Sequence, residues 1–273
     1  MKDFSGKVVA LTGAASGIGR ALAVRLGEEG ADLALGDVDE AGLNETAKLV
    51  DRSPKVTTHV VDVGDRHAVE AFALAVERRH GGVDVIVNNA GVGCVATVED
   101  ATYEDFDWVI GVNLWGVIHG VKAFLPLLRK RPEAHIVNVA SVNSFLPFPT
   151  SGPYNISKSG VEALSETLME ELSDTNVSVS CVYPGGVKTN ISRNARHTSD
   201  EENVEFERRA MATPDQAARR IIRGIKKDRK RIVVGVDAKL MVIARRLSPL
   251  GTLRLVTWGW RRTLKGRSGH PTP

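Results

Sequence analysis

The sequence predicts an α/β protein whose single parallel sheet is doubly wound, with helices on both faces. Short runs rich in Val, Ile and Leu alternate with amphipathic segments of helix length along most of the chain. Such alternation is typical of βαβ units, whose parallel sheet is covered on both sides. The 273 residues, 42% hydrophobic and 25% charged, have the composition of a globular protein. We therefore expect one doubly wound domain over residues 1–236 and a basic helical extension over residues 237–273.

The expected elements follow one another without an internal repeat. Strands are expected at residues 7–11, 33–35, 56–61, 83–87, 136–139 and 177–181, each a short apolar or β-branched run. Helices are expected between them at residues 19–29, 40–51, 68–79, 106–129 and 154–172, where apolar residues recur at helical spacing. Because a helix separates each strand from the next, these strands are expected to run parallel.

Two later regions depart from this pattern. Residues 190–213 are polar and charged, without a clear apolar face, and follow a Pro-Gly turn. This pattern indicates either a disordered loop or a substrate lid over a site. Beyond them we expect a helix at 215–228, a strand at 231–236 and amphipathic helical segments at 238–247 and 250–260.

Charge is distributed unevenly along the chain. Residues 214–273 hold 16 of the 36 Lys and Arg but three of the 33 acidic residues, which leaves 20 basic against 30 acidic residues before them. An acidic body with a basic end raises the question of an anionic partner.

Other features bound the class of protein. The two cysteines, Cys94 and Cys181, lie far apart and indicate neither a disulfide framework nor a metal-ligand pair. The first residues lack the apolar core of a signal peptide, and no uninterrupted apolar stretch reaches 18 residues. We expect a cytoplasmic protein without a transmembrane helix.

A glycine-rich turn joins the first expected strand to the first helix. It comprises Thr12, Gly13, Ala14, Ala15, Ser16, Gly17, Ile18 and Gly19. Glycines here let the backbone approach a pyrophosphate at a helix N-terminus. The spacing Gly-x3-Gly-x-Gly differs from the common dinucleotide fingerprint, so a plain tight connection is the alternative for the turn taken alone.

Asp37 ends the second expected strand, 18 residues after Gly19. A carboxylate there accepts hydrogen bonds from both hydroxyls of an adenosine ribose and repels a 2′-phosphate. Its sequence neighbours, Gly36 and Val38, are uncharged, which favours NAD without excluding NADP. An ordinary surface carboxylate at a strand end is an equally common reading.

Tyr154 and Lys158 are four residues apart at the start of an expected helix and therefore share a face. An ammonium beside a phenol favours the phenolate and lowers the phenol's pKa. A tyrosine tuned in this way can take a proton from an alcohol or return one to a ketone. Taken alone, a Tyr and a Lys four residues apart are more often an ordinary pair on an amphipathic helix without a catalytic role.

These segments together resemble the short-chain dehydrogenase/reductase family. Residues 12–19, Asn88-Asn89-Ala90-Gly91, Asn113, Ser141, Tyr154-x3-Lys158 and Pro184-Gly185 occur in the family's order over about residues 5–190. The resemblance implies a Rossmann-fold enzyme that transfers a hydride between NAD(P) and an alcohol or ketone, without a metal.

The resemblance also implies the role of each catalytic residue. Tyr154 is the general acid/base, Lys158 lowers its pKa, Ser141 holds the substrate oxygen and Asn113 supports a water that bridges to the lysine. The alternative for Asn113 is a packing or backbone-bonding side chain.

Further positions are implied to hold the cofactor. Asp62 and Val63 correspond to the pair that contacts the adenine. The segment beneath the adenosine ribose corresponds to Asn89, Ala90 and Gly91. The turn that holds the nicotinamide corresponds to Pro184, Gly185, Val187 and Thr189. By resemblance the subunits pair through the helices carrying Asn113 and Tyr154, as a homodimer or homotetramer.

Residues 142–149 form an apolar stretch between Ser141 and Tyr154 that includes Phe145 and Phe148. It favours a lipophilic small-molecule substrate, such as a steroid, retinoid or fatty-acyl derivative. Ordinary core packing is the competing interpretation.

The basic extension carries an apolar stripe (Leu240, Ile243, Ala244 and Leu247) and two tryptophans, Trp258 and Trp260. Basic amphipathic segments with tryptophan can lie at an anionic membrane surface. The alternative is a helix packed on the body or on a sister subunit. Nucleic acid is not expected as a partner.

Three functions stay open from the sequence. The first is an NAD-dependent oxidoreductase of a secondary alcohol or ketone. The second is an NADPH-dependent 3-oxoacyl-thioester reductase, against which Asp37 counts. The third is a non-catalytic nucleotide-binding regulator or membrane adaptor, which would not need Ser141, Tyr154 and Lys158 together.

Overall fold

The computed structural model describes residues 1–189, 191 and 194–266, and its centre is a parallel sheet. The seven strands stand in the order β3-β2-β1-β4-β5-β6-β7. They are β1 (Val8–Thr12), β2 (Asp32–Asp37), β3 (Val56–Val60), β4 (Val85–Asn88), β5 (Ala134–Val139), β6 (Val177–Pro184) and β7 (Arg231–Val234). The predicted doubly wound fold is confirmed.

The strand order reverses between β1 and β4, which are neighbours in the sheet. In open parallel sheets, ligands bind beyond the carboxyl ends of the strands at this switch point. The fold therefore directs the search for a site to the ends of β1, β4, β5 and β6.

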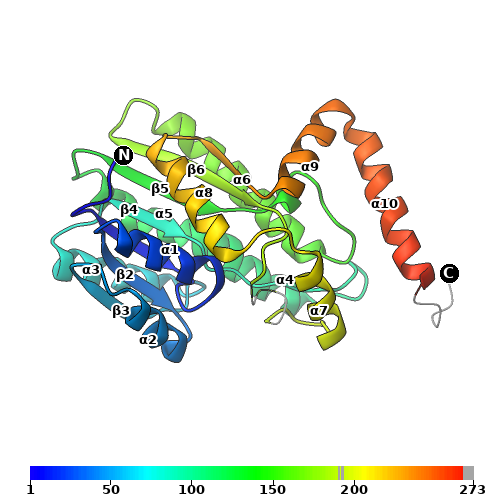
Figure 1. Cartoon of the computed structure of the whole chain (residues 1–273), viewed down its shortest axis with the longest axis horizontal. Helices are drawn as coiled ribbons and strands as arrows, with labels where there is room; N and C mark the ends of the chain where they lie inside the picture. Colours follow the sequence, from blue (N-terminus) through cyan, green and yellow to red (C-terminus); the bar gives the residue numbers. More distant parts are fainter. Residues whose placement is uncertain (190, 192–193, 267–273) are drawn as a thin grey trace.

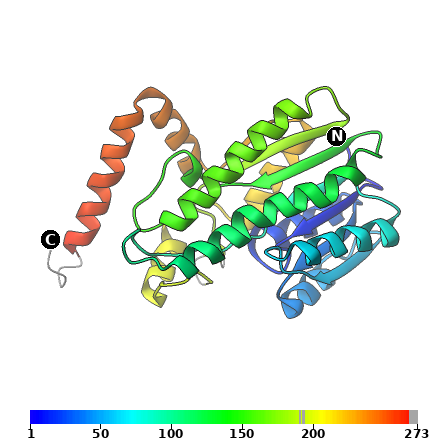
Figure 2. The same ribbon diagram turned by 180° about the vertical axis from the view of Figure 1, so that it is seen from behind.

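Helices cover both faces of the sheet (Figure 1). One face carries α1 (Gly17–Glu28), α2 (Glu40–Leu49) and α8 (Pro214–Lys226), and the other carries α3 (Arg66–His80), α5 (Gly116–Leu128) and α6 (Gly152–Glu171), which lie in front when the molecule is seen from behind (Figure 2). Strand β1 shows why both layers form, because Val9 and Leu11 pack into the first and Val8 and Ala10 into the second.

The predicted long helix is a continuous run made of α4 (Tyr103–Ile110), a π-helical turn η1 (Gly111–Trp115) and α5. Within the described part of the chain, this run is the one helix long and apolar enough to cross a membrane. Its residues Val117, Val121 and Phe124 pack in the core against the sheet. We therefore interpret its apolar character as that of a core helix.

Helix α7 (Asp200–Arg209) lies in the region predicted as a loop or lid. Its sequence lacks an apolar face, but acidic residues begin it and arginine ends it, as suits the helix dipole. Residues 190 and 192–193 of the predicted lid, and 267–273 of the predicted extension, lie outside the described residues. The extension itself contains α9 (Val236–Leu247) and α10 (Pro249–Gly266).

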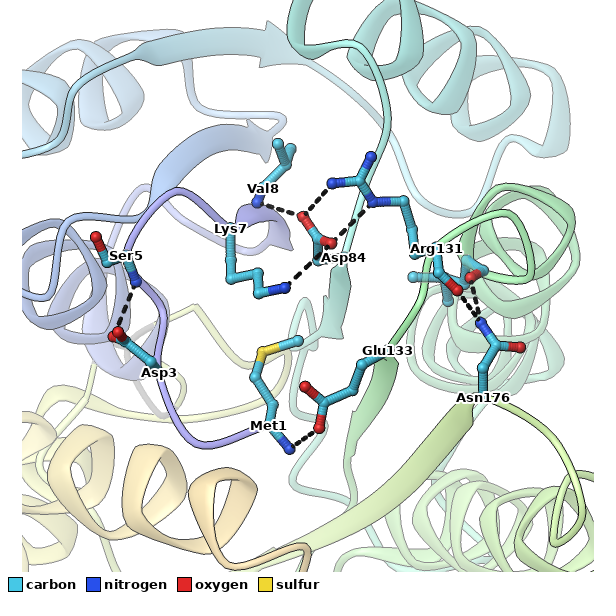
Figure 3. Close-up of polar contacts among 10 residues, drawn as sticks. Met1, Asp3, Ser5, Lys7, Val8, Asp84, Arg131, Glu133 and Asn176 are labelled. Atoms are coloured by element: carbon cyan, nitrogen blue, oxygen red, sulfur yellow. Dashed lines mark hydrogen bonds and ion pairs between the residues drawn. The ribbon is translucent and has the colours of Figure 1, made fainter.

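A buried carboxylate fastens the end of the sheet opposite the switch-point crevice (Figure 3). Asp84, fully buried just before β4, accepts hydrogen bonds from the Val8 backbone N–H at 2.9 Å and the Arg131 Nε at 2.8 Å. Asn176, before β6, donates to the Arg131 carbonyl at 2.5 Å. These bonds join the starts of β1, β4 and β6 and leave the other end of the sheet for function.

Candidate active site

The glycine-rich turn between β1 and α1 forms a cradle that side chains would fill. Gly13 has a φ of +67°, and a Cβ on it would lie 2.8 Å from the Ala90 Cα. A Cβ on Gly19 would lie 1.9 Å from the Gly13 carbonyl oxygen. Ser16, at the N-cap of α1, makes no side-chain capping bond, so its hydroxyl does not occupy the first-turn N–H groups of the helix. The turn fits a pyrophosphate.

The turn is hydrogen-bonded to the segment after β4. The Thr12 hydroxyl oxygen accepts from the backbone N–H groups of Asn89 at 3.1 Å and Ala90 at 3.2 Å. The Asn89 side-chain amide donates in return to the carbonyls of Thr12 at 2.9 Å and Gly13 at 3.1 Å. These bonds join the start of the glycine-rich turn to the segment after β4.

Asp37 lies at the end of β2 and faces this turn. Its carboxylate accepts from the Ala15 N–H at 2.9 Å and the Asp39 N–H at 3.1 Å. The guanidinium of Arg20, the first basic group after the turn, bonds to Thr46 at 3.0 Å and Glu45 at 2.9 Å of α2. The same guanidinium donates to the Ala15 carbonyl at 2.5 Å, so Arg20 lies at the turn that Asp37 faces and is bonded to both the turn and α2.

The predicted adenine pair follows β3 beside Asp37. The Val61 N–H donates to the Asp37 carbonyl at 2.8 Å, and Asp62 and Val63 come next in the chain. The Asp62 carboxylate accepts from the Gly64 N–H at 2.8 Å, while Val63 is buried. The two residues therefore lie next to Asp37, the candidate ligand of the adenosine ribose.

The turn after β6 reaches the phosphate cradle. A Cβ on Gly17 would lie 3.2 Å from the Thr189 side chain. The turn is held by Asp237, whose carboxylate accepts from the Gly186 N–H at 2.7 Å, and a Cβ on Gly185 would lie 2.3 Å from that carboxylate. Asp237 was not predicted to support this turn, because in sequence it looks like an ordinary acidic residue at the start of a helix.

Three of the four predicted catalytic residues (Ser141, Tyr154 and Lys158) meet where β5 ends and α6 begins. Tyr154 lies in the first turn of α6, and Ser141 follows β5 and shares a side-chain hydrogen bond with it. Buried Lys158 lies one turn further, with its Nζ 5.8 Å from the centre of the Tyr154 ring. That Nζ donates to the Val139 carbonyl at 2.9 Å.

The pKa of Tyr154 is raised, whereas the sequence predicts that it is lowered. Burial raises the pKa of the phenol, and the hydrogen bond with Ser141 offsets part of the rise. Burial also lowers the pKa of Lys158 to about 8. The physical reason is that burial penalises both charged forms while the ammonium is directed at the Val139 carbonyl. A lowered phenol pKa stays a prediction for the protein with its cofactor bound.

Asn113 holds the strand-end segment through both ends of its amide. The side chain, fully buried in the π-helical turn, accepts from the Val92 N–H at 2.8 Å and donates to the Val92 carbonyl at 2.9 Å. The backbone-bonding interpretation therefore describes its side chain. A Cβ on Gly91 would lie 3.2 Å from the Asn113 Oδ1 and 3.3 Å from the Lys158 Nζ, so the absence of a side chain at Gly91 leaves room for both groups.

The apolar stretch 142–149 divides between core and site. Phe145 packs on Tyr183 with ring centres 5.8 Å apart, and Leu146 is buried, as the core-packing alternative predicted. Phe148 is half-buried, and its carbonyl accepts from the Asn155 amide at 2.8 Å. Asn155, next to Tyr154, was not predicted as a site residue, yet it fixes this stretch to α6.

A clasp of three side chains (Asp105, Arg196 and His197) fastens the segment after Thr189 to α4. Buried Asp105 accepts from the Arg196 guanidinium at 3.1 Å and the His197 Nε2 at 2.8 Å. The Arg196 guanidinium also stacks on Trp108 at 4.2 Å. Sequence reasoning missed this clasp, since only the helix-capping pattern of Thr102 and Asp105 is visible locally.

The sulfur of Cys94 lies with ligand atoms of Asp105 and His197 within 4.8 Å, a spacing that a metal ion could use. The carboxylate, however, already accepts from Arg196, His197 and Thr102. These bonds, led by that of His197, hold the pKa of Asp105 well below its usual range. Tyr154 packs against the cluster of Cys94, Ala96 and Val109. We therefore interpret the trio as a fastening behind the tyrosine.

Asp105→Asn should loosen the clasp without removing the helix cap. The amide keeps the shape but loses the charge-assisted bonds, each worth about 1.5–3 kcal/mol. We expect KM for the alcohol to rise about tenfold with a smaller change in kcat, and trypsin to cut faster after Arg196. The matched control is Asp107→Asn, an exposed carboxylate on the same helix. Equal kinetics and proteolysis in the two variants would refute the clasp.

Known proteins resemble the chain along most of its length. A family model described as short chain dehydrogenase matches residues 7–200. A putative oxidoreductase, SadH, of Mycobacterium tuberculosis is 39% identical over 267 residues, covering 95% of this chain and 97% of that protein. The 3-oxoacyl-(acyl-carrier-protein) reductase FabG of Thermotoga maritima is 37% identical over 185 residues, 67% of this chain and 75% of that protein. A short chain dehydrogenase/reductase of Burkholderia phymatum, solved in complex with NAD, superposes with a TM-score of 0.82 at 31% identity, covering 100% of this chain and 99% of that one.

Proposed function

The chain belongs to the short-chain dehydrogenase family, and on that premise we propose that it is an NAD-dependent oxidoreductase of a lipophilic secondary alcohol or ketone. One observation carries the proposal: Ser141, Tyr154 and Lys158 meet beside a glycine cradle that fits a pyrophosphate. Turnover of secondary alcohols with NAD tests it. Cofactor binding without turnover on any of them would favour a non-catalytic nucleotide-binding regulator.

The mechanism follows from what each side chain can donate or accept. NAD, when bound, supplies the acceptor for the hydride that leaves the alcohol carbon. The Ser141 hydroxyl holds the substrate oxygen beside the Tyr154 oxygen. Tyr154, ionised as the phenolate, takes the proton of the substrate oxygen as the carbonyl forms and so becomes the neutral phenol. In the reverse direction Tyr154 returns the proton to the ketone oxygen. Lys158 provides the positive charge next to the phenol, and Asn113 fixes the backbone at Val92 behind it.

Cofactor preference rests on Asp37. Asp37→Ala should lower kcat/KM with NAD by about 10- to 100-fold, as expected for lost hydrogen bonds to a charged acceptor, and change kcat/KM with NADP much less. Asp37→Asn separates charge from structure, since its amide oxygen can still accept from the Ala15 N–H. We expect this variant, too, to reduce the ratio of kcat/KM with NAD to kcat/KM with NADP. Higher kcat/KM with NADP(H) than with NAD(H) in the unaltered enzyme would contradict the assignment.

The lipophilic substrate class is supported by the surroundings of Tyr154. Half-buried Phe148 lies on the loop that follows Ser141, and half-buried Val92 and Trp108 pack with Tyr154 on the same apolar cluster. A steroid, retinoid or fatty-acyl derivative suits such walls better than a polyol. A screen that favours sugars over lipophilic alcohols would overturn this part of the proposal.

A 3-oxoacyl-thioester reductase is the second candidate. The similarity to the Thermotoga maritima enzyme favours it, because that relative is named for this reaction. Asp37 counts against it, since a carboxylate at the ribose repels the 2′-phosphate of NADPH. The cytoplasmic location and the homodimer or homotetramer stay predictions.

A further inference from the structure

Helices α9 and α10 form a hairpin that projects from one end of the domain, with α10 set away from the body (Figures 1 and 2). The base of the hairpin lies beside the candidate site. Asp237, at the start of α9, holds Gly186 of the turn after β6, and α9 also contacts the 3₁₀ turn Val142–Ser144 that follows Ser141. Whatever the hairpin binds is thereby brought close to the site.

Helix α9 displays an apolar stripe to solvent. Val236, Leu240, Ile243 and Leu247 recur at i, i+4, i+7 and i+11, which places them on one face. All four are more than half exposed, from 54% for Ile243 to 81% for Leu247. Leu250, 69% exposed, continues the apolar surface into α10. Contiguous exposed apolar surface of this kind marks an interaction site.

The charge of the hairpin indicates what covers the stripe. Residues 237–266 contain seven Lys and Arg and one acidic residue, Asp237, which is bonded to Gly186. At helical spacing Lys239 and Arg246 lie along one border of the α9 stripe, and both are exposed. On α10, Arg254 and Arg261 lie on the same helix face as Leu250 and Trp258, since the four residues recur at i, i+4, i+8 and i+11.

We propose that this hairpin is a docking surface for an anionic phospholipid bilayer. The aliphatic stripe enters the outer edge of the acyl region, while the long basic side chains along its border reach the phosphate layer. Charge complementarity favours an anionic occupant over the hairpin of a second copy, because two sister hairpins carry charge of the same sign and repel each other. The competing occupant is the acidic body of a second copy. The proposal concerns binding and does not depend on the proposed reaction.

Co-sedimentation of the full-length protein with vesicles tests the proposal. The vesicles contain either phosphatidylcholine alone or 30% phosphatidylserine, each at low and high salt. We expect binding to the anionic vesicles at low salt, at least tenfold weaker binding at high salt, and background binding to phosphatidylcholine. Each basic residue near an anionic surface contributes roughly fivefold, so Arg246→Glu with Arg254→Glu should weaken binding by at least about 20-fold.

Stripe variants test the apolar contribution. Leu240→Asp with Ile243→Asp should also abolish binding, and both changes are at exposed positions that the fold tolerates. The matched control is Leu74→Asp, an exposed leucine on α3, which should bind like the unaltered protein. Background binding of the unaltered protein to anionic vesicles would overturn the proposal. A stripe variant that instead reduces the oligomeric state in sedimentation analysis, with vesicle binding unchanged, would assign the stripe to a second copy.

Discussion

Tyr154→Phe should reduce turnover by about 10³-fold while NAD still binds, within the 10²–10⁴ range that a general acid/base typically contributes. Phenylalanine keeps the ring that packs against Cys94 and Ala96, so the wall of the site stays in place. It removes the hydroxyl that bonds to Ser141 and exchanges the proton with the substrate oxygen. Steady-state turnover and the dissociation constant of NAD, measured on the same preparation, check both halves of this prediction.

Tyr103→Phe is the matched control, since that tyrosine is 87% exposed on α4 and away from the described catalytic residues. It should leave both turnover and NAD binding unchanged. Unchanged turnover in Tyr154→Phe would refute Tyr154 as the proton donor. Loss of NAD binding in that variant would instead assign Tyr154 a structural role.

Lys158→Met should abolish most of the turnover and at the same time stabilise the fold. Burial lowers the pKa of Lys158 from 10.5 to about 8, a shift that corresponds to about 3 kcal/mol at pH 7. Methionine removes that cost but leaves the Val139 carbonyl without its Nζ donor, a loss of about 1–2 kcal/mol. The free energy of unfolding at pH 7 should therefore rise by roughly 1–2 kcal/mol.

The pH dependence of the free energy of unfolding tests the same assignment. Between pH 8 and 10.5 the unfolded chain holds the Lys158 proton more firmly than the folded one. The free energy of unfolding of the unaltered protein should therefore increase with pH across that window, relative to Lys158→Met. Urea unfolding at pH 7 and above pH 9 measures the difference, with Lys122→Met, an exposed lysine on α5, as control. A less stable Lys158→Met variant at pH 7 would contradict the cost assigned to burying this ammonium.

The fold was largely predictable because its signals are local. Buried parallel strands read as short apolar runs, so each strand was predicted within a few residues of its place. The start of α4 was predicted three residues too late, since the capping residues Thr102 and Asp105 precede the apolar repeat. Helix α7 was missed because periodicity detects an apolar face, which this segment lacks.

The site was predictable only where its residues lie on one helix or strand, or where they follow the order of the family's motifs along the chain. Tyr154 and Lys158 sit one turn apart on a single helix, and the family resemblance supplied Ser141. The Asp105–Arg196 bond joins residues 91 positions apart, and the Gly186–Asp237 bond joins residues 51 apart. No local pattern encodes such pairs, because the topology of the sheet brings them together.

The most direct test of the account is kcat/KM with NAD and with NADP across steroids, retinol, aliphatic secondary alcohols and hydroxyacyl thioesters, together with the corresponding carbonyl compounds. We predict that NAD gives the higher kcat/KM values and that lipophilic secondary alcohols or their ketones are the best substrates. Highest kcat/KM for NADPH with a 3-oxoacyl thioester would contradict it and identify the second candidate.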